Sequence, residues 1–207
     1  MKKILLIVSV MMLSISAWCQ QEVGSFTIQP KVGLNIANYT DADGSDPRIG
    51  LAAGFEFEYQ ASTHFGLAFG LLYSAQGSKA SETNYVTKTK VVAQTDYVNL
   101  PIMANIYIVK GLAFKLGLQP AFNVKDKYKA SVSDQWSNAS INTKGNLSDF
   151  DIDVKSFDFS IPIGLSYEFC SGFVVDARYN LGVTKMAKDS DSRNSVWQFT
   201  VGYKFKL

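Results

Sequence analysis

The chain is poor in the residues on which most enzyme and metal sites depend. Its 207 residues include one histidine, His64, and two cysteines, and no stretch has the spacing of a zinc site, a phosphate loop or a nucleotide motif. Because His64 falls in a short predicted turn, far from the long loops, a histidine-assisted catalytic site has no candidate base. We therefore expect no enzymatic activity, no cofactor and no bound metal.

An excess of charge of one sign is also missing. Twenty Lys and Arg residues stand against 18 Asp and Glu residues, which gives a formal net charge of +2. This balance argues against the basic field that nucleic-acid binding requires, so we expect no nucleic-acid partner. The 47% hydrophobic and 13% aromatic content is ample for one folded domain and argues against disorder.

No apolar run is long enough to cross a bilayer as a helix, but the N-terminus has the features of a secretory signal. Two lysines precede the apolar run Ile4–Ile15, and the polar stretch SAWCQQE follows it. We predict that residues 1–19 are a signal peptide cleaved after Cys19, which leaves residues 20–207 as the mature domain. The alternative is a lipid anchor on a retained Cys19, which the bulky Trp18 disfavours.

Cleavage at that position would leave Cys170 as the only cysteine of the mature chain. We therefore expect no intramolecular disulfide, even in an oxidising compartment. Other interactions must hold the fold together.

Apolar residues alternate with small or polar residues in eight segments of the mature chain, and no segment has a convincing amphipathic helical pattern. In SFTIQPKVGLNIAN, for example, every even-numbered position from Phe26 to Ile36 is apolar. A period of two residues is typical of β-strands with two different faces. The expected strands are 25–38, 49–59, 65–74, 97–108, 112–124, 156–169, 173–183 and 196–207.

The connections between these strands are alternately short and long. Short turns are expected at 60–64, 109–111 and 170–172, and long polar loops at 39–48, 75–95, 125–155 and 184–195. An even number of long strands with this layout is typical of a barrel in the bacterial outer membrane. The predicted fold is all-β: an eight-stranded antiparallel up-and-down transmembrane β-barrel with short periplasmic turns, long extracellular loops and both termini in the periplasm.

Alternation alone leaves open which face points inward. A soluble lipocalin-like barrel would enclose the apolar face, whereas a membrane barrel exposes it to lipid. The apolar face carries large side chains and no charged residue, while the other face is rich in Gly, Ala, Ser and Asn. Because the interior of eight strands is narrow, the small face fits inside, and we predict lipid on the outside. Aromatic residues expected at the two membrane interfaces are Tyr39, Tyr59, Tyr73, Tyr167, Trp197 and Tyr203.

The inward face carries charges of both signs. Enclosed ions must pair or keep water, so we predict an ion-pair network that plugs the lumen. A conducting or ligand-binding lumen is the alternative, and the narrow bore disfavours it. The predicted network comprises Lys31, Glu56, Glu58, Lys115, Asp158, Glu168, Asp176, Arg178, Lys204 and Lys206.

The chain ends on TVGYKFKL, which alternates up to its last residue. We expect this strand to pair with the first strand and so to leave no open edge. A polar residue, a glycine and alternating hydrophobic residues also resemble the C-terminal signal that barrel-assembly machinery recognises. The predicted signal comprises Gly202, Tyr203, Phe205 and Leu207.

Several stretches resemble the PorT-like outer-membrane β-barrel family of Gram-negative bacteria. They are QQE after the signal, KVGLNIAN in the first strand, DYVNLPIMANIYI with Tyr97 and Pro101, and the terminal GYKFKL. The resemblance covers the mature chain and implies an integral outer-membrane protein. One branch of that family is tied to a protein-secretion apparatus.

We expect a structural or interaction protein that acts through its surface loops or through envelope partners. The loop 125–155 offers Tyr128 and Trp136 as contact anchors. The expected partners are outer-membrane lipid, the barrel-assembly machinery and an envelope or secretion-system protein. A narrow-pore or small-molecule transport protein is the alternative, and a soluble lipocalin-like binder is a further one.

Overall fold

The computed structural model describes residues 22–40, 45–83, 87–134, 140–147, 154–186 and 191–207. The predicted signal peptide and its cleavage site lie outside these residues. Within the described segments, no helix is long and apolar enough to cross a membrane.

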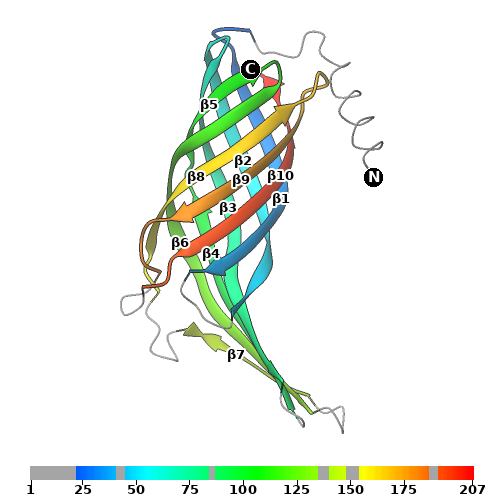
Figure 1. Ribbon diagram of the computed structural model, residues 1–207, viewed down its shortest axis with the longest axis vertical. Coiled ribbons are helices and arrows are strands. Elements are labelled where there is room, and N and C mark those ends of the chain that lie inside the picture. Colours follow the sequence, from blue (N-terminus) through cyan, green and yellow to red (C-terminus); the bar gives the residue numbers. More distant parts are fainter. Residues whose placement is uncertain (1–21, 41–44, 84–86, 135–139, 148–153, 187–190) are drawn as a thin grey trace.

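Antiparallel strands make up nearly all of the described structure (Figure 1). They form a ring, because β1 pairs with β10 in a register that sets Leu34 opposite Phe199. Eight continuous strands, which we call staves, close this ring. β4 and β5 together form one stave, β10 and β11 form another, and β7 lies outside the ring because it pairs only with β6. The strands are β1 (Phe26–Tyr39), β2 (Ser45–Ser62), β3 (Phe65–Thr83), β4 (Thr87–Asn99), β5 (Ile102–Val109), β6 (Leu112–Asp134), β7 (Ser140–Asn146), β8 (Phe157–Glu168), β9 (Phe173–Gly182), β10 (Asn194–Tyr203) and β11 (Phe205–Lys206).

The predicted strand 97–108 is one stave with a short interruption at Leu100 and Pro101. Proline has no backbone N–H to donate to the ladder, so a strand is weakened where it stands. The adjacent groups still find partners: Leu100 N donates to Pro120 O at 2.8 Å, and Pro101 O accepts from Gly70 N at 2.9 Å. The alternation therefore continues through the break.

The prediction of loops at 75–95 and 125–155 is wrong over most of their length. Strand β3 continues to Thr83, β4 begins at Thr87, β6 reaches Asp134 and β7 adds a further strand. These segments project beyond the ring, and β7 lies beside them as an edge strand paired with β6 (Figure 1). Outside the membrane a strand no longer needs one uncharged apolar face, so its sequence looks polar although its backbone ladder persists. Strand β2 likewise begins at Ser45, inside the predicted loop 39–48.

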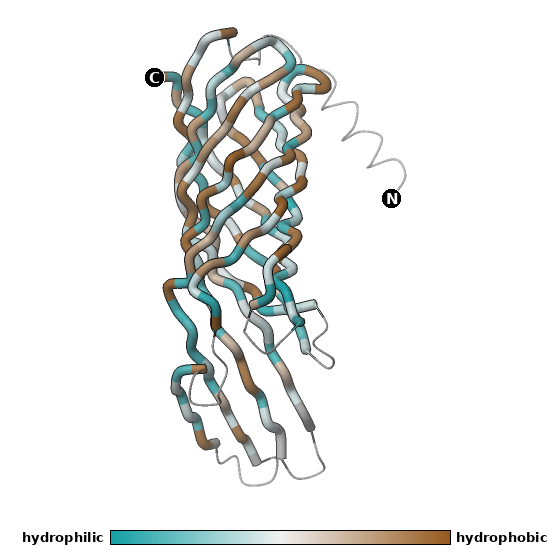
Figure 2. The backbone as a smooth tube through the Cα atoms, turned by 90° about the vertical axis from the view of Figure 1, so that its left-hand side faces the viewer, coloured by the Kyte–Doolittle hydropathy of each residue, from teal (hydrophilic) through white to brown (hydrophobic). Residues whose placement is uncertain are grey.

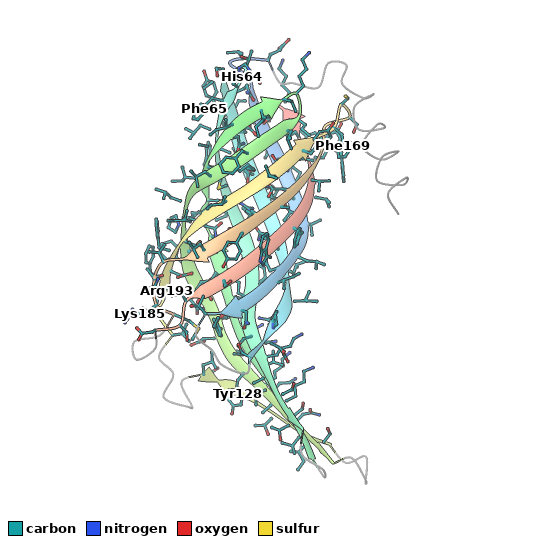
Figure 3. All side chains as sticks on the ribbon, in the orientation of Figure 1. His64, Phe65, Tyr128, Phe169, Lys185 and Arg193 are labelled. Atoms are coloured by element: carbon teal, nitrogen blue, oxygen red, sulfur yellow. The ribbon has the colours of Figure 1, made fainter. Side chains whose placement is uncertain are left out.

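The two ends of the barrel differ. The turn end carries the short connections after β2, β5 and β8 together with the beginning of β1 and the end of β11, and His64, Phe65 and Phe169 lie there (Figure 3). The loop end carries the projecting strands, which we call the extension: residues 45–47 of β2, 75–83 of β3, 87–96 of β4, 125–134 of β6 and all of β7.

The outward-facing assignment of the apolar side chains is confirmed. Leu34, Phe55 and Phe199 are about half exposed, and large apolar side chains cover the outside of the ring. Hydropathy alternates along the tube in Figure 2, while buried polar residues such as Asn35 and Gln198 face inward. Asn35 Oδ1 accepts a hydrogen bond from Gln198 Nε2 at 2.8 Å.

One expected interface aromatic lies on the other face. Tyr39 is buried, and its hydroxyl lies 2.8 Å from Thr95 Oγ1. It has the same parity as Asn35 and Ala37, which point inward, so the prediction that it faces lipid is wrong. Tyr59, Tyr73, Trp197 and Tyr203 are exposed on the outside.

Cys170 is disulfide-bonded in the full chain. The expected lone thiol belongs to the chain after cleavage behind Cys19, which would remove the other cysteine, so that expectation stays a prediction. The other cysteine of the chain, Cys19, lies outside the described residues.

Candidate functional site

A cluster of buried ions inside the barrel joins β1, β2, β6 and β9. Lys31 Nζ donates to Glu56 Oε2 at 2.8 Å and lies 3.7 Å from Asp176 Oδ2. Lys115 Nζ donates to both carboxylates, to Asp176 at 2.9 Å. Arg178 lies between the same two acids, at 3.9 Å from Glu56 and 3.8 Å from Asp176. Three cations therefore share two carboxylates.

This central cluster spans the lumen. Strand β2 and strand β6 are separated by two staves, yet Glu56 and Lys115 are in direct contact. Glu56, Lys115 and Arg178 are at most 2% exposed. Gly54, opposite Lys31, allows the close approach of β3, since a β-carbon there would lie 2.1 Å from a backbone oxygen of that strand. Side chains from opposite walls of the barrel therefore meet across the lumen at this level.

A second ion cluster lies inside the barrel at the turn end. Lys204 Nζ lies 2.8 Å from Glu58 Oε2 and 2.8 Å from Glu168 Oε2. The Tyr107 hydroxyl donates to Glu58 and accepts from Lys204 Nζ at 3.1 Å. One cation therefore holds two carboxylates here, and its charge balance is opposite to that of the central cluster.

Two predicted lumen residues behave differently. Asp158 faces inward but has no cationic partner among the described residues, and instead accepts hydrogen bonds from Thr184 and, at 2.9 Å, from Asn194 Nδ2. Lys206 is exposed and pairs with Glu22, because its stave has left the lumen by that point. The prediction of Lys206 as a lumen residue is thus wrong, whereas the other nine residues are buried and face inward.

The predicted terminal signal lies on the closing stave. Gly202 stands opposite Lys31 of β1, and Tyr203 and Phe205 are exposed on the outer face with ring centroids 4.8 Å apart. Leu207 N donates to Phe26 O at 2.9 Å, so the ladder continues to the last residue.

Sequence reasoning missed an ion cluster at the outer rim of the loop end. Asp96, only 1% exposed, accepts a hydrogen bond from Tyr73 at 2.7 Å and lies 3.1 Å from both Arg48 and Lys125. A bulge creates it: Asp96 is opposite Lys125 while Tyr97 is opposite Asn123, so one residue of β6 is extra. Asp96 lies between the predicted loop 75–95 and the predicted strand 97–108, and its outward parity was the only available signal.

The inner face of the extension is mostly apolar and borders a hollow of about 470 Å³. Tyr128 lines this hollow from β6, opposite Gly145 of β7, in the part of the molecule that projects beyond the ring (Figure 3). The other predicted anchor, Trp136, lies outside the described residues. The hollow is lined by Tyr39, Ser78, Ala80, Val91, Ala93, Tyr128, Leu147 and Met186. In the described part of the chain, no group of three His, Cys, Asp or Glu residues could hold a metal ion.

A closed antiparallel ring with an apolar exterior and an ion-paired interior defines a transmembrane β-barrel of the outer-membrane type. Residues 18–188 match the family described as outer membrane protein beta-barrel domain, and the chain belongs to this family. No curated protein sequence matches the chain.

Three solved structures share the fold at low identity. Ail, the attachment invasion locus protein of Yersinia pestis, is 15% identical with a TM-score of 0.49, over 89% of this chain and 100% of its own. Neisserial surface protein A is 14% identical with a TM-score of 0.44, over 87% and 97%. The N-terminal β-barrel domain of Pseudomonas aeruginosa OprF is 13% identical with a TM-score of 0.37, over 89% and 100%. At these identities the likeness concerns the fold alone. In such barrels the turn end faces the periplasm and the loop end faces the outside.

Proposed function

We propose that the protein is a non-conducting, non-enzymatic anchor in the outer membrane that presents the extension to a partner at the cell surface. The observation that carries this proposal is the central ion cluster, in which Glu56 and Lys115 meet across the lumen with almost no exposure. Permeation would require these ions to separate, and an uncompensated buried charge costs several kcal/mol (~3 to 5).

The inner face of the extension supports an interaction role. Its hollow of about 470 Å³ is mostly apolar, and Tyr128 supplies the kind of aromatic group that dominates binding energy at interfaces. We propose an envelope protein as the partner. The PorT-like resemblance suggests that this partner is a component of a secretion apparatus. Export through the signal in residues 1–19 and insertion by the barrel-assembly machinery, which would read Gly202, Tyr203, Phe205 and Leu207, belong to the same proposal.

Conductance of single barrels in a planar bilayer tests the closed lumen. We expect no steps for the wild type, and steps for the variant Glu56→Ala/Lys115→Ala, which removes the pair that spans the bore. The variant Glu22→Ala/Lys110→Ala, which alters exposed charges at the turn end, is the control. Steps in the wild type would overturn the closed lumen and favour the narrow-pore alternative.

Photocrosslinking in cells tests the interaction role. A photoreactive residue at position 128 should give one adduct with an envelope protein, whereas the same residue at position 129 on the opposite face should not. Equal adducts from both positions, or none from position 128, would contradict a partner on the inner face.

A further inference from the structure

The outer face of the extension carries a concentration of lysines that the closed barrel does not need. Cross-strand register places them on one face: Lys79 and Lys129 are both opposite Val92, Lys144 is opposite Lys129, and Lys127 is opposite Gln94. We call this surface the lysine face. It consists of Lys79, Lys90, Lys125, Lys127, Lys129 and Lys144.

This arrangement is unfavourable in the isolated molecule. Lys129 and Lys144 are directly opposite each other, and like charges in that position destabilise a sheet. Among the described residues, Lys125 alone of the six forms an ion pair, with Asp96. In the described part of the extension, the face has one further acid, Asp46, opposite Lys79, whereas Asp126 lies on the inner face opposite Thr95. An external anion would relieve this repulsion.

The position of the face identifies the anion. Against β4, strand β3 runs without a register shift from Tyr73, on the lipid-covered wall, to Lys79, so the lysine face is the continuation of that wall beyond the membrane. Lys125 lies at the rim, just beyond Tyr73 and Val124 in the direction away from the membrane. Lys129 lies about 13 Å farther along β6, at roughly 3.3 Å per residue. The headgroup layer is about 5 to 8 Å thick on each side of the hydrocarbon. Flexible lysine side chains from the lower part of the face therefore reach the headgroups.

We propose that the lysine face binds phosphate groups of anionic lipid headgroups in the leaflet that surrounds the loop end. Lysines near a charged membrane surface each favour binding by a factor of roughly five, and the phosphates supply the counterions that the sheet lacks. Asp96 fixes the base of the face by holding Lys125 and Arg48 at the rim. The proposal rests on the membrane placement of the barrel and is independent of whether the lumen conducts.

Lipid selectivity at the barrel surface tests this proposal. The full chain is reconstituted in nanodiscs of phosphatidylcholine, and electron spin resonance measures the relative association of spin-labelled phosphatidylglycerol and spin-labelled phosphatidylcholine. We expect the wild type to prefer phosphatidylglycerol several-fold at low salt, with a preference that weakens as salt rises. Lys127→Gln/Lys129→Gln should remove most of that preference and bring the ratio close to one.

The matched control is Lys110→Gln/Lys185→Gln, which removes two exposed lysines away from the face and should keep the preference. Heat-modifiable migration on a gel verifies that each variant is folded. Equal preference in the wild type and in Lys127→Gln/Lys129→Gln overturns the proposal. Lysine-dependent binding of soluble polyphosphate by a wild type that shows no lipid preference also overturns it, in favour of a soluble polyanion.

Discussion

Removing one carboxylate from the central cluster should destabilise the barrel strongly. Glu56 is the carboxylate shared by Lys31, Lys115 and Arg178, and it is 1% exposed. Glu56→Gln keeps the shape of the side chain, so no cavity forms, but it leaves three buried cations with Asp176 as their nearest acid. Breaking a buried ion pair by removing one partner costs about 3 to 5 kcal/mol, and we expect the free energy of unfolding to fall by that amount.

Reversible urea unfolding from phospholipid vesicles measures this change. Fluorescence of Trp197, which is half exposed on the outer face, reports the transfer from lipid to water. Glu56→Gln/Lys115→Met removes both partners and returns the cluster to its original net charge, so most of the loss should be recovered. Glu22→Gln, at an exposed carboxylate, should leave the transition unchanged. A wild-type midpoint for Glu56→Gln would show that the cluster is solvated, and the argument for a closed lumen would fail.

Three further outcomes are expected. Phe199→Lys places a charge on the lipid-facing wall far from either rim and should lower the free energy of unfolding by about 2 to 4 kcal/mol. Val183→Lys, near the loop end, should lower it by only about 0 to 1 kcal/mol. Similar losses for the two variants in the same unfolding assay would contradict lipid on this face. Asp96→Asn leaves Arg48 and Lys125 without their shared acid and should cost about 1 to 3 kcal/mol, with faster amide hydrogen exchange in β4 and β6 near the rim; unchanged exchange there would argue that the cluster is not structural. The hydrogen bond from Lys206 lowers the pKa of Glu22 below its ordinary value of 4.5, with the lysine's charge as the second cause. The stabilising contribution of this ion pair is therefore present above pH 4.5 and is lost as the pH falls through the lowered pKa of Glu22. An NMR titration of the Glu22 carboxyl should show a lowered pKa in the wild type and an ordinary pKa in Lys206→Gln. Equal pKa values in the two proteins would exclude the interaction.

The membrane-spanning part of the fold could be predicted because lipid imposes a strict rule on each strand. Leu34 and Phe55 had to face hydrocarbon, so their neighbours Asn35 and Glu56 had to face inward. The rule no longer applies where the strands leave the membrane. Residues 75–95 therefore looked like a loop, although Lys79 and Val92 are paired in a regular ladder.

The candidate site could be predicted only as a set of inward-facing residues. Parity placed Lys115 in the lumen, but the stagger between staves decides that it meets Glu56 and Asp176. The sequence carries no local signal for that stagger. Lys206 shares the parity of Lys204 yet lies past the end of the lumen, and strand ends are the least certain feature of any such prediction. The bulge beside Asp96 likewise depends on the partner strand.

The seam between β1 and β10 also governs how the barrel forms. Its register joins Lys31 to Gly202, segments near opposite ends of the polypeptide, and contacts so distant in sequence slow folding because a long loop must close first. Until the seam closes, β1 and the last strand in place each keep a row of unpaired amides and carbonyls. Such edges recruit other chains, and in hydrocarbon they are costly. The partly assembled barrel is therefore the aggregation-prone species. A catalyst that shields both edges until they pair would affect the yield of folded barrels more than the stability of the finished ring does.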